Sequence, residues 1–184
     1  MELNKIHKVY FLGIGGIGMS ALARFFKNIG KEVAGYDKTP TELTERLIAE
    51  GISITFEDSL DTMMINPDLL VFTPAIPKNH LQLNEYKDKG FRLYKRAEVL
   101  GLIANSMFNI SIGGSHGKTS TSSITAHIFK NSGEDVAAFL GGIAVNYHSN
   151  FLQGNKYAIA EADEFDRSFL QLNPNILLLT SIDT

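Results

Sequence analysis

Short strand-like runs alternate with segments of helical periodicity along this chain. In the first part of the chain, the pattern of apolar residues predicts strands over Val9–Ile14, Glu32–Tyr36, Ile52–Phe56, Leu69–Thr73 and Phe91–Tyr94. Between them the pattern predicts helices over Ile17–Ile29, from Thr39–Glu42 to just before Gly51, over Leu81–Lys89 and over Arg96–Ala104. Strands that alternate with helices form parallel sheets, so the pattern predicts an α/β fold.

Helix boundaries follow from local signals. The first helix places apolar residues on one face and is expected to end before Gly30, because glycine favours the left-handed conformation there. The second helix is expected to begin with a capping box over Thr39–Glu42, with Pro40 at the first helical position.

The alternation resumes near Phe108. A strand over Phe108–Ile112 precedes helical periodicity over Ser122–Lys130, and further strands are expected at Val136–Leu140, Tyr157–Ala162 and Ile176–Ile182. We therefore predict a Rossmann-like, parallel-sheet domain over residues 1–105, followed by a P-loop-type α/β domain over residues 106–184. The second domain has few strands and helices for a P-loop sheet, so we expect it to be incomplete and the chain to be a fragment.

The first glycine motif, Gly13–Gly18, has the spacing G-x-G-x-x-G between a strand and a helix. This arrangement is typical of a dinucleotide or nucleotide-sugar site, because a helix N-terminus binds pyrophosphate. Asp37 ends the next strand, where it is either a partner of a ribose hydroxyl or a solvated turn residue. The alternative role for the glycines is close packing of helix on strand. The binding residues expected here are Gly13, Gly15, Gly16, Ile17, Gly18 and Asp37, with Thr73 and Ala75 on the opposite wall.

A second glycine motif follows the strand at Phe108–Ile112. It reads G-x-x-G-K-T over Gly114–Thr119, and Ile112 stands where the longer G-x-x-x-x-G-K-[ST] pattern would have its first glycine. Loop amides and a helix N-terminus attract phosphate, Lys118 adds a cation, and Thr119 adds a hydroxyl for a phosphate-bound Mg²⁺. A plain strand-to-helix turn is the alternative. The residues expected to bind ATP are Gly114, Ser115, His116, Gly117, Lys118, Thr119 and Ser120.

An acidic segment follows the strand at Tyr157–Ala162. Glu161 lies at its carboxyl end, the edge at which parallel sheets bind ligands, so Thr119 and Glu161 are expected to converge on one Mg²⁺. Asp163, Glu164 and Asp166 are either functional or part of a solvated acidic loop.

Composition narrows the class of protein. The chain has 184 residues, of which 44% are hydrophobic and 20% charged, as in soluble globular proteins. It has no cysteine, so disulfides and thiolate metal sites are excluded. Its net charge of −3 provides no basic field for nucleic acid, and no apolar run is long enough for a membrane span. We expect a cytoplasmic protein without nucleic-acid or membrane partners; the sequence does not indicate its oligomeric state.

Three classes of protein remain. An NAD-dependent oxidoreductase or nucleotide-sugar dehydrogenase uses the first loop only, and a plain P-loop ATPase uses the second only. An enzyme that holds a nucleotide-linked substrate on one domain and ATP on the next uses both. A fragment that binds a nucleotide sugar without catalysis is a fourth possibility, for this chain alone.

The chain resembles the N-terminal part of the Mur ligases of peptidoglycan synthesis. The motifs that carry the resemblance are Gly13–Ser20, Gly114–Thr119 and Glu161–Glu164. The short phosphate loop is the family's own form. Gly-Gly-Ile-Gly-Met-Ser favours the branch that adds L-alanine to UDP-N-acetylmuramate over the branch that recycles muropeptides.

The resemblance implies roles for these residues. The first loop would hold the UDP pyrophosphate, Lys118 would stabilise the transferred phosphoryl group, and Thr119 and Glu161 would bind Mg²⁺. ATP would phosphorylate the substrate carboxylate, and the amine of L-alanine would attack the acyl phosphate. Family members continue with an Asp-His segment and a C-terminal domain, so the 184-residue chain alone is expected to lack turnover.

Overall fold

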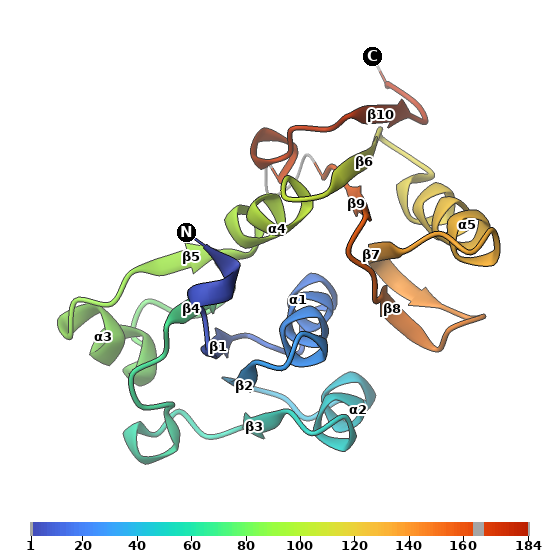
Figure 1. Cartoon of the computed structure of the whole chain (residues 1–184). Coiled ribbons are helices and arrows are strands. Elements are labelled where there is room, and N and C mark those ends of the chain that lie inside the picture. The colour runs from blue at the N-terminus through green and yellow to red at the C-terminus, as the bar shows by residue number, and fades with distance from the viewer. Residues whose placement is uncertain (1, 164–167, 184) are drawn as a thin grey trace. The chain divides into compact units, whose positions relative to one another are not determined.

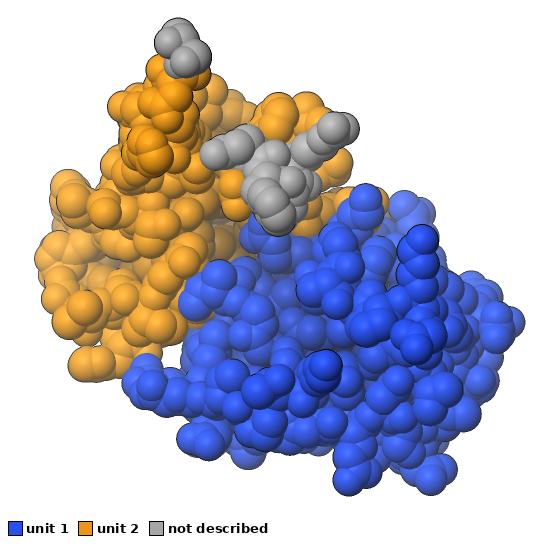
Figure 2. All heavy atoms as spheres, turned by 180° about the vertical axis from the view of Figure 1, so that it is seen from behind, with its two compact units in different colours: residues 1–96 blue, residues 97–184 orange. Residues whose placement is uncertain are grey.

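The computed structural model describes residues 2–163 and 168–183. The chain divides into two compact units, residues 1–96 and 97–184, which are coloured separately in Figure 2. Each unit has a sheet of its own.

Five parallel strands form the first sheet, in the order β3-β2-β1-β4-β5 (Figure 1). The strands are β1 (Lys8–Leu12), β2 (Glu32–Tyr36), β3 (Ser53–Thr55), β4 (Leu69–Phe72) and β5 (Leu93–Lys95). The helices are α1 (Ile17–Asn28), α2 (Glu42–Ala49) and α3 (Leu81–Asp88), with short 3₁₀ turns η1 (Leu3–Lys5) and η2 (Leu60–Thr62). The predicted parallel α/β fold is confirmed for this unit.

Helices cover both faces of this sheet, as the contacts of neighbouring side chains on β1 show. The Phe11 ring lies 6.4 Å from that of Phe26 on α1, whereas the Tyr10 ring lies 5.6 Å from that of Tyr86 on α3. Neighbouring residues of a strand point to opposite faces, so α1 and α3 cover opposite sides.

The start of α2 differs from the prediction. Thr41, not Thr39, is the N-cap, and its capping box is completed by Thr44, whose hydroxyl accepts from the Thr41 amide at 2.8 Å. Pro40 therefore lies before the helix. Two threonines close this box, whereas the sequence pattern relied on Glu42.

The second sheet is mixed, in the order β10-β6-β9-β7-β8 (Figure 1). The strands are β6 (Phe108–Gly113), β7 (Val136–Ala144), β8 (Ser149–Leu152), β9 (Tyr157–Glu161) and β10 (Ile176–Leu179). The helices in this part of the chain are α4 (Arg96–Ala104) and α5 (Lys118–Asn131), with a 3₁₀ turn η3 (Ser168–Gln171). The sequence pattern missed β8, which pairs antiparallel with β7. This strand has a polar first half, so it lacks the continuous apolar signal of its neighbours.

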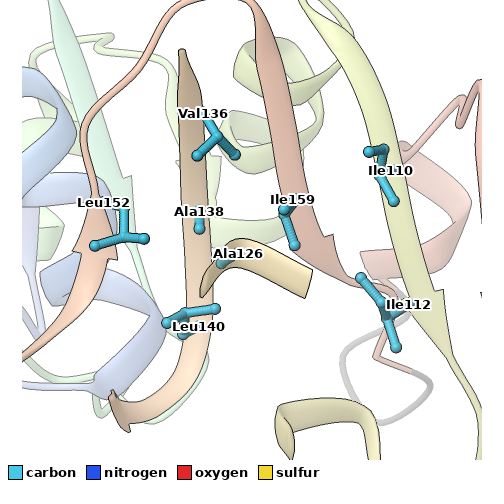
Figure 3. Close-up of a cluster of buried hydrophobic side chains, with 8 residues drawn as sticks. All are labelled: Ile110, Ile112, Ala126, Val136, Ala138, Leu140, Leu152 and Ile159. Atoms are coloured by element: carbon cyan, nitrogen blue, oxygen red, sulfur yellow. The ribbon is translucent and has the colours of Figure 1, made fainter. Parts of the chain in front are cut away.

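One face of the second sheet packs against α5. Figure 3 shows the buried cluster, in which strand side chains gather around Ala126 of α5. The strand members are Ile110, Ile112, Val136, Ala138, Leu140, Leu152 and Ile159. This core fixes the carboxyl ends of β6 and β9 relative to the first turn of α5.

Helix α4 groups with the second unit. A Cβ on Gly101 would lie 2.5 Å from the backbone carbonyl oxygen of Gln171, and the side-chain amide of Asn105 donates to that oxygen at 2.8 Å. The predicted domain boundary at 105/106 follows this helix, whereas the compact units divide directly after its first residue, Arg96.

A carboxylate joins the starts of β1 and β4. Asp68 accepts from the backbone amides of His7 and Lys8 at 2.8 and 2.9 Å. The hydrogen bonds from Lys8 and His7 lower the pKa of Asp68.

We expect Asp68→Ala to lower the free energy of unfolding at pH 7 by about 1 kcal/mol, because two amides lose their acceptor at an exposed site. The folded-state pKa is depressed, so this stabilisation is present above the unfolded-state pKa of about 3.9 and is lost as pH falls through the folded value. Urea denaturation of both proteins at pH 7 and near pH 2.5 checks this. A difference that persists unchanged at low pH would contradict it, and exposed Asp61→Ala is the control.

Candidate functional site

The first glycine loop, Gly13–Gly18, is hydrogen-bonded to the end of β2. Gly13 has a φ of 89°, a left-handed conformation that glycine adopts readily. The amides of Gly13 and Ile14 donate to the Tyr36 carbonyl at 2.8 and 3.0 Å. The loop thus turns sharply at the carboxyl end of β1, the central strand of the sheet.

Asp37 is hydrogen-bonded to the same loop. Its Oδ2 accepts from the Gly15 amide at 2.7 Å, and its Oδ1 accepts from the Thr39 amide at 3.2 Å. The carboxylate therefore orients the loop. Its expected contact with a ribose stays a prediction.

Thr73, which is predicted to lie on the opposite wall of this site, lies against Gly13. The Thr73 amide donates to the Leu12 carbonyl at 3.2 Å, and a Cβ on Gly13 would lie 2.3 Å from Thr73 Cγ2. Ala75 follows in a turn in which its amide donates to the Thr73 hydroxyl at 3.4 Å.

The N-terminus of α1 is positively polarised. Its N-cap, Gly16, has no side chain, and its first turn has no acidic residue. The Arg96 guanidinium packs on this turn, because a Cβ on Gly18 would lie 2.6 Å from Arg96 Nη1. The sequence pattern indicates Arg96 only as the start of a helix. The signal for a role at the site was its position directly after β5, because the carboxyl ends of parallel strands lie at the same edge of the sheet, where ligands bind.

The second glycine loop joins β6 to α5. Gly114 and Gly117 have φ values of 131° and 80°, and α5 begins at Lys118. The Lys118 ammonium folds back and donates to the Gly114 carbonyl at 2.6 Å. Gly117 as N-cap offers no side-chain cap, and the first turn has no acidic residue.

Segment 180–183 runs along this loop. The amides of Ser115 and His116 donate to the carbonyl and hydroxyl oxygens of Ser181, each at 3.0 Å. The Thr180 hydroxyl donates to the His116 carbonyl, and the His116 ring lies 3.2 Å from the Asp183 carboxylate. The Ser115 and His116 amides, which were expected to donate to phosphate, thus donate to Ser181 oxygens in this structure.

Glu161 lies where the second loop meets the sheet. It ends β9 and pairs in register with Ile112 of β6. The Thr119 hydroxyl donates to its Oε2 at 3.1 Å, so the structure brings together the two residues expected to share Mg²⁺. The Ser122 hydroxyl and the Gly141 amide both donate to Oε1 at 2.8 Å. The sequence motifs do not indicate these two donors, although Ser122 lies one helical turn beyond Thr119.

The pair of oxygens fits Mg²⁺. Two ligands bound side by side on an octahedral ion at about 2.1 Å lie about 3 Å apart, close to the observed 3.1 Å. Among the described residues, no group of three or more His, Cys, Asp or Glu side chains is placed to hold a metal. Mg²⁺ commonly uses one or two protein oxygens together with substrate phosphates and water, so one carboxylate is sufficient.

The remaining predicted residues are less informative. Ser120 is exposed in the first turn of α5. The Asp163 amide donates to the Ser168 hydroxyl at 2.9 Å. Glu164 and Asp166 lie outside the described residues. Within the part of the chain that the structure describes, no helix is both long and apolar enough to cross a membrane.

The family of the chain follows from comparison with known proteins. Residues 8–107 match the model of the Mur ligase family, catalytic domain. The chain belongs to the Mur ligase family. This confirms the resemblance of the chain to the Mur ligases, and it does not support the oxidoreductase alternative.

Several Mur ligases are similar over the whole chain. UDP-N-acetylmuramate–L-alanine ligases of Flavobacterium psychrophilum and Flavobacterium johnsoniae are 54% and 53% identical over 100% of the chain. The chain spans 42% of the length of each. The crystal structure of UDP-N-acetylmuramate-alanine ligase from Thermotoga maritima superposes with a TM-score of 0.87 at 31% identity, covering 95% of this chain and 41% of that one.

Proposed function

We propose that this chain is part of an ATP-dependent ligase that joins L-alanine to UDP-N-acetylmuramate. The observation that carries the proposal is the arrangement of Lys118, Thr119 and Glu161 at the carboxyl ends of β6 and β9. It brings a lysine ammonium and a hydroxyl–carboxylate pair, which would hold Mg²⁺, beside one glycine loop. The choice of UDP-N-acetylmuramate and L-alanine is supported by the two relatives that carry this activity in their names.

The second unit would hold the triphosphate. Amides of the Gly114–Thr119 loop and the Lys118 ammonium would bind the β- and γ-phosphates, while Thr119 and Glu161 would hold Mg²⁺. When bound, Mg²⁺ neutralises phosphate charge. The γ-phosphoryl group passes to an oxygen of the substrate carboxylate and ADP leaves. The alanine amine then attacks the acyl carbon, phosphate leaves, and the nitrogen loses a proton.

The first unit would hold the sugar nucleotide. The N-terminus of α1 and the Arg96 guanidinium provide positive charge for its diphosphate. Asp37 would keep the loop in shape through Gly15, and Thr73 would support Gly13 from the other side.

An ADP-release assay on the full-length protein that contains this chain tests the proposal. ADP formation should require ATP, Mg²⁺, UDP-N-acetylmuramate and L-alanine together, and omission of any one should abolish it. ADP release that is independent of both acceptors would indicate a plain ATPase. Turnover with a muropeptide but not with L-alanine would reject the alanine-adding branch.

A further inference from the structure

We propose that Gly141 and Ser122 are positioning residues that hold the Glu161 carboxylate facing Thr119. This inference rests on the proposed function, in which Glu161 binds Mg²⁺. The two residues come from β7 and α5, and neither belongs to the glycine loop or to β9.

The hydrogen bonds distinguish the two oxygens of Glu161. Oε1 accepts from both the Ser122 hydroxyl and the Gly141 amide, each at 2.8 Å, so its two lone pairs are engaged. Oε2 accepts from the Thr119 hydroxyl at 3.1 Å and keeps a second lone pair for a cation. The donors on Oε1 therefore decide which oxygen is presented to the metal.

The Ser122 hydroxyl is well placed for this role. Its side chain is fully buried, and its oxygen also lies 3.0 Å from the Thr119 carbonyl. The hydroxyl carries a single hydrogen, and of its two acceptors the charged Glu161 oxygen is the nearer, at 2.8 Å. Ser122 thus links the carboxylate to the same helical turn that carries Thr119.

Gly141 contributes space as well as an amide. A Cβ at this position would lie 2.5 Å from Glu161 Oε2 and 3.0 Å from Oε1, so the carboxylate occupies the volume of any larger side chain. The backbone of Gly141 is not left-handed, so glycine is not required there by conformation. Its requirement is steric, and the group it accommodates is Glu161.

The neighbouring glycine provides a matched control. A Cβ on Gly142 would lie 3.4 Å from Thr119 Cγ2, an ordinary van der Waals contact, and its φ is also not left-handed. Gly141→Ala should displace the Glu161 carboxylate, which is the far end of a flexible side chain, without disturbing the fold. Gly142→Ala adds the same methyl group without meeting the carboxylate.

The test measures metal binding in the full-length protein. Electron paramagnetic resonance of Mn²⁺ in the presence of a non-hydrolysable ATP analogue reports occupancy without turnover. Loss of an outer hydrogen-bonding partner typically weakens metal affinity about 10- to 100-fold. We expect Gly141→Ala and Ser122→Ala to weaken Mn²⁺ binding at least about tenfold, and Gly142→Ala and Ser123→Ala to change it less than about threefold. Ser122→Thr, which keeps the hydroxyl, should recover most of the affinity.

The outcomes separate this inference from the proposed function. If the wild-type protein takes up no Mn²⁺ with the analogue, the proposed function fails. If the wild type binds Mn²⁺ and Gly141→Ala and Ser122→Ala bind it equally well, only the positioning role is overturned. Thermal unfolding shows whether each variant is folded, and Ser122→Ala decides the question if Gly141→Ala lowers the melting temperature.

Discussion

Replacing Lys118 with alanine is expected to lower ADP formation by the full-length protein about 1,000-fold, the upper range for loss of one preorganised charge-stabilising group. The Lys118 ammonium lies over the phosphate loop, 2.6 Å from the Gly114 carbonyl, at the start of α5. Its charge would meet the negative charge that spreads over the transferred phosphoryl group. Without it, the amides and the helix N-terminus remain, but they carry only partial charges.

The measurement pairs steady-state ADP release with calorimetric titration of UDP-N-acetylmuramate. Titration of the sugar nucleotide should be unchanged, because its binding site is assigned to the first unit. Lys130→Ala is the control, since Lys130 is exposed in the last turn of the same helix. Turnover within about tenfold of wild type in Lys118→Ala would exclude the assigned role of the lysine.

Replacing Gly13 with alanine is expected to destabilise the first unit by about 3 kcal/mol and to weaken UDP-N-acetylmuramate binding about 100-fold. Two causes add. A left-handed φ of 89° costs an alanine about 1–2 kcal/mol, and the overlap at 2.3 Å with Thr73 Cγ2 costs about 1–3 kcal/mol. The displaced loop would no longer direct its helix N-terminus at the diphosphate.

A second substitution separates these causes. Thr73→Ser removes Cγ2 and keeps the hydroxyl that accepts from the Ala75 amide. In the Gly13→Ala background it should restore about 1–3 kcal/mol, the steric part alone. Gly30→Ala is the matched control, because Gly30 has a φ of 78° and nothing within 4 Å of its Cβ position. Equal losses in Gly13→Ala and Gly30→Ala would show that contact with Thr73 is irrelevant.

Local patterns predicted most of the elements. The sequence predicts strand β2 (Glu32–Tyr36) and helix α4 (Arg96–Ala104) with the bounds that the structure has. Hydrophobic periodicity and glycines at the ends of elements depend only on residues that are close in the sequence. The failures are also local in origin. Strand β8 begins with a polar pair, and Thr41 rather than Thr39 caps α2 because Thr44 provides the reciprocal hydrogen bond.

Contacts between distant residues account for what the patterns could not predict at the site. The motifs indicate two strand–loop–helix turns and an acidic residue at the end of a strand, because glycine spacing and a Lys-Thr pair can be recognised from residues that are adjacent in the sequence. They do not indicate which acceptor each amide finds. Asp37 holds Gly15 across 22 positions, and Ser122 and Gly141 reach Glu161 across 39 and 20. Only packing of β7, β9 and α5 around one core brings those groups within hydrogen-bonding distance, so the orientation of the carboxylate is a property of the folded chain.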